Sequence, residues 1–365
     1  MNKYTYRGHS PLSYAKEACD TMMRKFDAED LPPKAHFHYH QGVFLSGMEK
    51  TYLLSKEEKY RTYIDAWVNS LVTPDGELHG FHSDELDDIQ PGILLYRMYE
   101  ESGDKRYEKA IHTLMDVLRN FPKNKEGGFW HKGKNRDQMW LDGLYMAGPF
   151  SALYGKTFHD TECFDSCVFQ ALLMERKTKD RKTGLLYHAW DSTKERPWAD
   201  PQTGCSPEFW GRAIGWVLVA LFDELECMPE TQQGYEELTA FALRLLEAVE
   251  NYQDFSGLWY QVIDKGQDPH NWPETSCTCL FAAAICKGVG LGFLDKSHLA
   301  KAVKAFEGVI DRLEYKGEDL IIGGICVGTG VGDYMHYCNR PTSENDLHGT
   351  GAFLLMCTEM ERVIK

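Results

Sequence analysis

Three aspartates stand where predicted buried helices begin, and a carboxyl group in that setting can act as an acid or a base. Asp142 follows Trp140 and Leu141, so we expect its carboxyl group to be partly desolvated. Desolvation raises the pKa of a carboxyl group and would make Asp142 a usable general acid near neutral pH. An aspartate at this position can also cap its own helix. The spacing alone leaves both roles open.

Asp87 and Asp88 open the preceding predicted helix in the same way that Asp142 opens its own. Adjacent openings could place two carboxyl groups within several ångströms of each other. Paired carboxyl groups are the usual apparatus of glycoside hydrolysis, with one proton donor and one partner. The alternative is that Asp87 and Asp88 cap a helix within a solvated acidic turn.

Arg212 and Trp216 are four residues apart, which places them on one face of a predicted helix. A tryptophan can stack on a sugar ring while an arginine binds a carboxylate, so this pair suits an anionic sugar. The alternative is that Arg212 pairs with Glu208 or with an aspartate from another repeat.

The histidines fall into two groups. His131 and His188 occupy equivalent turns, where each could bind a substrate, orient an aspartate or serve the structure. His36, His38 and His40 alternate, and such a run on a strand could bind a metal ion. The surrounding sequence predicts no strand there, so we expect no metal site and no cofactor.

A pattern that recurs about six times must position these residues. A short turn of glycine, aromatic and histidine residues precedes an apolar helix in each unit, and the turns lie near 38–40, 80–82, 128–131, 184–188, 257–261 and 324–327. The apolar helices begin near Gln41, Asp87, Asp142, Arg212, Ser276 and Asp346. A repeat of this size decides the whole fold.

Amphipathic helices alternate with the apolar ones. Their apolar residues recur at helical spacing, as in residues 103–120, and similar stretches run roughly over 11–27, 57–72, 158–178, 235–249 and 295–313. Helices that are apolar on all sides are buried, so inner and outer helices alternate. This predicts an all-α (α/α)6 toroid, a single domain over 1–365, with the inner helix starts around one mouth. An open helical solenoid is the alternative.

Composition limits the partners. The 365-residue chain has a formal net charge of −15, which disfavours nucleic acid and anionic membranes. The sequence has no signal-peptide pattern and no apolar run that could cross a bilayer, and its eleven cysteines suit a reducing compartment. We therefore expect a cytoplasmic monomer or homodimer, in which local cations offset the negative field for an anionic substrate.

Together the motifs resemble the unsaturated rhamnogalacturonyl hydrolases of glycoside hydrolase family 105, which are relatives of the unsaturated glucuronyl hydrolases. The motifs are LDDIQPG at 86–92, GGFWHK at 127–132, MWLDGLYM at 139–146, LYHAWD at 186–191, FWGRAIGW at 209–216 and ENDLHG at 344–349. The resemblance implies an (α/α)6 barrel that removes an unsaturated uronic acid from the non-reducing end of short oligosaccharides made by polysaccharide lyases.

The resemblance also implies roles for individual residues. Asp142 matches the family's general acid/base, and Asp87 matches the partner aspartate, with Asp88 as the alternative register. The substrate contacts implied are His131, Lys132, His188, Arg212 and Trp216. The implied chemistry is hydration of the C4=C5 vinyl ether of the sugar, for which no metal or organic cofactor is expected.

Other functions remain open from the sequence. The family name suggests rhamnose as the aglycone, but other neighbouring sugars are possible, as in an unsaturated glucuronyl hydrolase. An inverting glycosidase that acts on saturated oligosaccharides could use the same toroid. A non-catalytic sugar-binding toroid is a third alternative.

Overall fold

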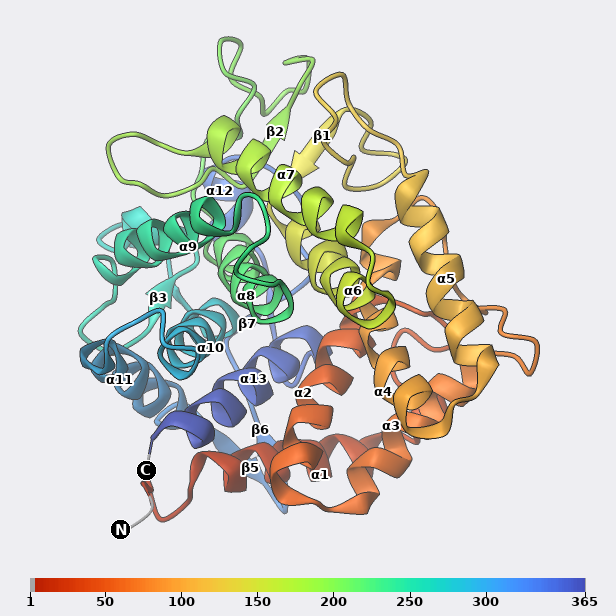
Figure 1. Cartoon of the computed structure of the whole chain (residues 1–365). Helices are drawn as coiled ribbons and strands as arrows, with labels where there is room; N and C mark the ends of the chain where they lie inside the picture. The colour runs from red at the N-terminus through yellow and green to blue at the C-terminus, as the bar shows by residue number, and fades with distance from the viewer. Residues whose placement is uncertain (1–3, 365) are drawn as a thin grey trace.

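The computed structural model describes residues 4–364, so residues 1–3 and 365 of the predicted single domain lie outside the described residues. Helices form a ring, in which inner and outer helices alternate along the chain (Figure 1). The inner helices are α2 (Tyr39–Ser55), α4 (Ile93–Ser102), α6 (Asp142–Phe158), α8 (Gly211–Cys227), α10 (Thr275–Gly290) and α13 (Leu347–Val363). The outer helices are α1 (Pro11–Lys25), α3 (Glu58–Leu71), α5 (Lys105–Arg119), α7 (Thr161–Thr178), α9 (Tyr235–Glu250) and α11 (Leu299–Ile310).

The ring closes where the last inner helix, α13, packs on the first, α2. Glycine makes this approach close: a Cβ atom on Gly351 would lie 2.6 Å from the backbone of Val43, and one on Gly47 would lie 2.6 Å from Leu354 Cβ. A larger side chain at either glycine would push the two helices apart. The closed toroid is therefore confirmed, and the open solenoid is not what the chain forms.

Backbone hydrogen bonds join successive repeats around the mouth of the ring. In five places a residue close to the start of an inner helix donates its backbone N–H to a carbonyl group in the turn of the next repeat. The pairs are Phe37 to Gly80 (3.0 Å), Leu86 to His131 (3.2 Å), Leu141 to His188 (2.9 Å), Gly211 to Gln261 (2.9 Å) and Thr275 to Gly324 (3.0 Å). Each turn residue is therefore held beside the helix start of the preceding repeat.

Short two-stranded antiparallel sheets reinforce these turns. Within residues 4–364 they pair β1 (Gln138–Trp140) with β2 (Ala189–Asp191), β3 (Trp259–Tyr260) with β4 (Pro273–Glu274), β5 (Glu314–Lys316) with β6 (Asp319–Ile321), and β7 (Ile325–Cys326) with β8 (Thr342–Ser343). The register of β1 and β2 places Trp140 opposite Ala189. The next residues outward are Leu141 and His188, and the N–H of Leu141 donates to the carbonyl oxygen of His188 at 2.9 Å. Asp142 follows Leu141, and its side chain contacts that of His188. A short helix, α12 (Tyr334–Cys338), lies between β7 and β8.

The second inner helix begins later than the sequence predicts. Asp87 lies in a 3-10 turn, Leu86–Asp88, and a second 3-10 turn, Gln90–Gly92, precedes α4. Pro91 has no N–H to donate and disfavours the α conformation of the residue before it, so α4 starts only after it. The delay leaves Asp87 on a turn at the mouth.

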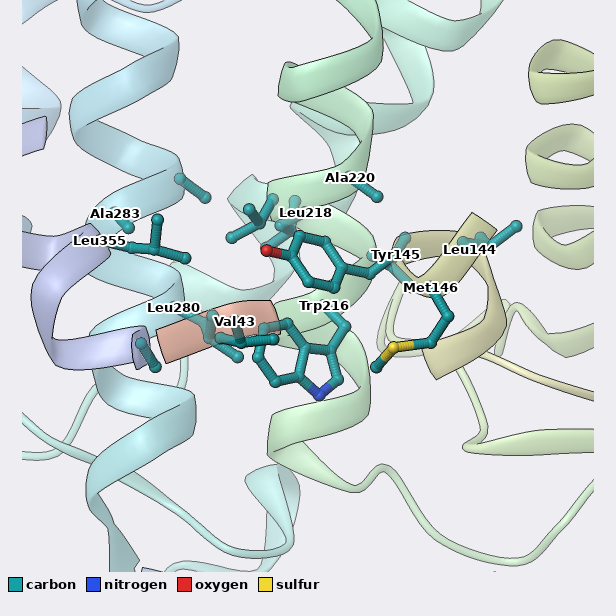
Figure 2. Close-up of a cluster of buried hydrophobic side chains, with 14 of the residues drawn as sticks. Val43, Leu144, Tyr145, Met146, Trp216, Leu218, Ala220, Leu280, Ala283 and Leu355 are labelled. Carbon is teal, nitrogen blue, oxygen red and sulfur yellow. The ribbon is translucent and has the colours of Figure 1, made fainter. Parts of the chain in front are cut away.

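Side chains fill the centre of the ring below the mouth. Figure 2 shows Val43, Tyr145, Trp216, Leu280 and Leu355 from five inner helices meeting in one cluster. The rings of Trp216 and Tyr145 stack with centroids 4.6 Å apart. The toroid therefore has a solid core, and the inner helices are apolar on all sides because they contact both this core and the outer helices. Over residues 4–364, none of these helices has the length and apolarity that crossing a bilayer requires.

Candidate active site

A cavity of about 290 Å³ lies at the mouth of the ring, where the inner helices begin. Five of the eight residues singled out from the sequence line it: Asp87, His131, Lys132, Asp142 and Arg212. His188 contacts Asp142 from the side. Asp88 and Trp216 lie elsewhere, as described below.

Asp142 is the first residue of α6, and its carboxylate contacts a buried histidine. His188 Nε2 lies 3.0 Å from Asp142 Oδ2, and the side chain of His188 is fully buried. Leu141, not Asp142, occupies the N-cap position of α6, and the Asp142 carboxylate contacts His188 instead, so the capping role does not apply. The geometry leaves its carboxyl group available to the cavity.

The expected rise in the pKa of Asp142 is wrong for the free protein. Burial does raise this pKa, but the hydrogen bond from His188 and the charges of His131 and Arg212 outweigh burial and lower it. The sequence showed the apolar neighbours Trp140 and Leu141, whereas the decisive partner, His188, comes from the next repeat. Asp142 is therefore ionised at neutral pH when the cavity is empty.

Asp87 is held as a carboxylate by its neighbours. Lys132 Nζ lies 2.6 Å from Asp87 Oδ2, and His131 Nε2 lies 3.6 Å from Asp87 Oδ1. Burial would raise the pKa of Asp87, but His131 and Lys132 lower it to about 2. Lys132 also contacts Glu85 at 2.9 Å. Asp87 is thus a permanent anion at the cavity wall.

Asp88 points away from the cavity and ties two segments together. Its Oδ1 lies 2.5 Å from His38 Nδ1, and its Oδ2 accepts the backbone N–H of His82 at 2.8 Å. The Asp88 side chain is 1% exposed and does not line the cavity. This corrects the alternative register: of the two adjacent aspartates, Asp87 faces the candidate site.

Arg212 lines the cavity, but its guanidinium group mainly fastens a loop. Its Nη1 donates to the carbonyl oxygen of Cys326 at 2.6 Å, and its Nη2 donates to that of Val327 at 2.9 Å. The guanidinium also lies over the ring of Trp210, 4.5 Å from its centroid. The alternative pairing of Arg212 with Glu208 does not form, since Glu208 contacts Lys265 instead. The segment beyond Val327 contributes Gly328, Thr329 and Gly330 to the cavity.

Trp216 does not reach the cavity. It is 1% exposed and lies one turn deeper than Arg212, in the core shown in Figure 2. Trp140 and Trp210 line the cavity instead, and Trp140 stacks on His131 with centroids 4.4 Å apart. The four-residue spacing identified the correct helix but not the depth of each side chain along it.

Several lining residues were not recognised in the sequence. Tyr39, Lys134 and Met146 line the cavity, and Tyr337 contacts His188 from behind. Lys134 and Met146 lie inside or next to quoted motifs, so proximity could have found them. Tyr337 is 149 positions from His188, and no local pattern indicates their contact.

Two groups of potential metal-ligating side chains occur within residues 4–364. His40, Asp346 and His348 form one group, and His38, Glu85 and Asp87 form the other. Each group could hold a metal ion by residue type, but Lys132 already supplies a cation to Glu85 and Asp87. The alternating histidines do not act together, because His38 and His40 join different groups and His36 joins neither.

Comparison with known proteins identifies the family. The sequence model of Glycosyl Hydrolase Family 88 matches residues 14–364. A solved glycoside hydrolase from family 105 of C. acetobutylicum ATCC 824 is 34% identical, with a TM-score of 0.91, and the match covers 95% of this chain and 99% of that chain. The unsaturated rhamnogalacturonyl hydrolase YesR of Bacillus subtilis is 26% identical over 80% of this chain and 79% of YesR.

A more distant structure shares the fold. The unsaturated glucuronyl hydrolase of Bacillus sp. GL1 is 17% identical, with a TM-score of 0.71 and a match covering 96% of this chain and 97% of that chain. The predicted family resemblance and the helical toroid are both confirmed. The chain therefore belongs to Glycosyl Hydrolase Family 88, is similar over nearly its whole length to a family 105 enzyme, and is a glycosidase.

Proposed function

We propose that this glycosidase removes a 4,5-unsaturated uronic acid from the non-reducing end of a short oligosaccharide released by a polysaccharide lyase. The observation that carries the proposal is the convergence of Asp142 and Asp87 on one small cavity together with cationic residues. The names of the relatives point the same way, since YesR is an unsaturated rhamnogalacturonyl hydrolase. That relative favours rhamnose as the aglycone.

The chemistry is hydration of a vinyl ether. Asp142 donates a proton to C4, and the π electrons of the C4=C5 bond form the new C–H bond. The ring oxygen stabilises the cation left at C5, and water then adds to C5 while its proton returns to Asp142. The resulting hemiketal opens and expels the aglycone alcohol, so one water is consumed overall. A positioned acid–base group of this kind contributes roughly 10²–10⁴-fold in rate.

Binding of the substrate explains how an ionised Asp142 acquires its proton. The pKa of Asp142 is low in the free protein because His188, His131 and Arg212 outweigh its burial. The carboxylate of the bound sugar brings a negative charge into the same cavity and displaces water. Both changes raise the pKa of Asp142, so the acid forms when the substrate is present.

The remaining lining residues bind and orient the sugar in this proposal. Asp87 is anionic and can accept hydrogen bonds from sugar hydroxyl groups or orient the water, and Lys132 holds it in place. Trp140 is partly exposed at the cavity and offers an aromatic face for the sugar ring. The cavity volume of about 290 Å³ lies near the lower end of small-molecule pockets, about 300–1,000 Å³, which suits a short oligosaccharide end.

Matched substrates test this function. We expect the purified protein to release the uronate from an unsaturated rhamnogalacturonan disaccharide, with loss of the ultraviolet absorbance of the conjugated double bond. The saturated disaccharide should remain intact. Cleavage of the saturated substrate at a similar rate would favour an inverting glycosidase, and no turnover of either would favour a binding toroid.

We also propose a single catalytic domain that works in the cytoplasm as a monomer or homodimer, without nucleic acid or membrane partners. One contiguous hydrophobic core supports the single domain. All eleven cysteines, which lie within residues 4–364, are free thiols, and this suits a reducing compartment.

A further inference from the structure

His188 is enclosed between a carboxylate and a phenol. Its Nε2 lies 3.0 Å from Asp142 Oδ2, and its Nδ1 lies 2.7 Å from the hydroxyl of Tyr337. Both His188 and Tyr337 are fully buried. The two ring nitrogens of His188 therefore have one protein partner each, and the three side chains form a continuous chain that ends at the candidate acid.

The hydrogen-bond partners decide where the protons lie. The hydroxyl oxygen of Tyr337 also accepts the backbone N–H of Gly332 at 3.3 Å. Of the two partners of this hydroxyl, the Gly332 N–H can only donate, so His188 Nδ1 is the partner that can accept the phenol proton. A neutral histidine that accepts at Nδ1 carries its proton on Nε2. His188 then donates from Nε2 to Asp142.

We propose that Tyr337 is a positioning residue that fixes the tautomer of His188, so that the Nε2–H of His188 is directed at Oδ2 of Asp142. The tautomer of His188 does not depend on the proposed function; only its effect on catalysis rests on that function. With Oδ2 occupied by His188, Oδ1 is the oxygen left to exchange a proton with the substrate. Tyr337 thereby sets both the orientation of the acid and the pH at which it gains a proton.

Packing holds Tyr337 in this place. Its ring stacks on Trp210 with centroids 5.9 Å apart, and His188 packs on the same tryptophan at 4.6 Å. The carbonyl oxygen of Tyr337 accepts from Gln261 Nε2 at 3.2 Å. Tyr337 belongs to α12, in the segment that also supplies the cavity residues Gly328–Gly330. The same segment therefore forms part of the mouth and orients the acid.

Removing the Tyr337 hydroxyl should weaken the donor on Asp142. A histidine whose Nδ1 no longer accepts a hydrogen bond is a poorer donor at Nε2, so the carboxylate loses stabilisation and binds its proton more readily. The other charged or titratable groups facing this chain remain in Tyr337→Phe; they are His131, Arg212, Tyr39, Glu208 and Asp333. A shift in the pH profile is therefore assigned to the hydroxyl alone.

Tyr334 supplies a matched control on the same helix. It also belongs to α12, and its hydroxyl lies beside Asp268 and Cys338 rather than beside His188. Tyr334→Phe removes the same atom from α12 but leaves the contact between Tyr337 and His188 intact. A general effect of loosening α12 would affect both variants, whereas the proposed effect is confined to Tyr337→Phe.

The first test is the pH dependence of kcat/KM on the unsaturated disaccharide. We expect the limb that reports Asp142 to move upward by roughly half to one pH unit in Tyr337→Phe, the size expected for one net hydrogen bond. The limb should not move in Tyr334→Phe. An unchanged limb in a folded Tyr337→Phe protein overturns the proposal.

The second test needs no turnover, so it separates this proposal from the proposed function. ¹⁵N-labelled histidine in the wild-type chain, assigned through the missing signals of His188→Gln, shows which ring nitrogen of His188 carries the proton. We expect a protonated Nε2 and an unprotonated, hydrogen-bonded Nδ1. A proton found on Nδ1 with an unprotonated Nε2 overturns the proposal, even if Tyr337→Phe fails to fold. The protein could fail to hydrolyse the disaccharide and still give the expected spectrum.

Discussion

The ammonium group of Lys132 lies 2.6 Å from a carboxylate oxygen of Asp87, whereas Asp142 has a histidine, His188, at 3.0 Å. The two aspartates of one cavity thus differ in their partners. A lysine stays charged near neutral pH and keeps Asp87 ionised, whereas Asp142 has a hydrogen bond from His188 and no ammonium group beside it. The partners therefore assign the fixed anion to Asp87 and the exchangeable proton to Asp142.

Lys132→Met should destabilise the protein in a pH-dependent way. The pKa of Asp87 is lowered to about 2 from an ordinary 3.8, so its ionised form stabilises the fold above the unfolded pKa, by on the order of 2 kcal/mol. This contribution is lost as the pH falls from about 4 through about 2. Urea unfolding of wild type and variant should differ most at neutral pH and converge in acid. An equal difference at all pH values would contradict this assignment.

Lys134→Gln should weaken substrate binding without slowing the chemistry. Lys134 lines the cavity and is exposed, while the Nη donors of Arg212 and the ammonium of Lys132 already contact protein oxygens. With a net charge of −15, the chain needs a local cation for an anionic sugar. We expect KM to rise roughly two- to fivefold at low salt, and less at high salt, with kcat unchanged. Lys125→Gln, in the preceding turn, is the control; a similar rise there would contradict the role of Lys134.

Arg212→Lys should loosen the loop at the mouth. Lysine keeps the charge but cannot donate to the carbonyl groups of Cys326 and Val327 in the same geometry. Leaving buried carbonyl groups unpaired costs about 1–3 kcal/mol, so we expect a lower melting temperature and faster proteolysis between residues 326 and 332. Arg244→Lys, at a surface ion pair, should change neither. An Arg212→Lys protein with wild-type stability but a raised KM would show that Arg212 serves the substrate alone.

Trp216→Phe should affect stability and leave catalysis nearly intact. Trp216 packs on Tyr145 in the core and does not line the cavity (Figure 2). We expect a loss of about 1–3 kcal/mol in the free energy of unfolding, measured by urea titration, with kcat/KM close to wild type. Trp140→Phe should show the opposite pattern, with a raised KM. A raised KM in Trp216→Phe would restore its predicted contact with the substrate.

The sequence predicts most of the fold because its signals are local. Apolar and amphipathic helices alternate, and a recognisable turn of glycine, aromatic and histidine residues precedes each apolar helix. The equivalence of the His131 and His188 turns also follows from the repeat, whereas their pairing with Asp87 and Asp142 is seen only in the structure, where each turn bonds to the helix start of the preceding repeat. The equivalence of the turns depends on periodicity, which a single sequence contains.

The remaining features of the site depend on how far each side chain lies below the mouth of the ring and on contacts between segments that are distant in the sequence. Trp216 shares a helix with Arg212 but lies one turn below the mouth, and Asp88 is turned toward His38 although it adjoins Asp87. The contact of Tyr337 with His188 joins segments 149 positions apart. The direction of the pKa shift at Asp142 was missed for the same reason. Its nearest neighbours in the sequence are apolar, whereas His188, whose hydrogen bond lowers the pKa, comes from another repeat.

Delivery of a proton from Asp142 to C4 is tested most directly by turnover of the unsaturated disaccharide in D₂O, with NMR analysis of the released uronate. The account predicts that the wild-type product carries deuterium at C4 in a single configuration, and that Asp142→Asn forms almost no product while remaining folded. A product with deuterium in both C4 configurations, or near-normal turnover by Asp142→Asn, would contradict it.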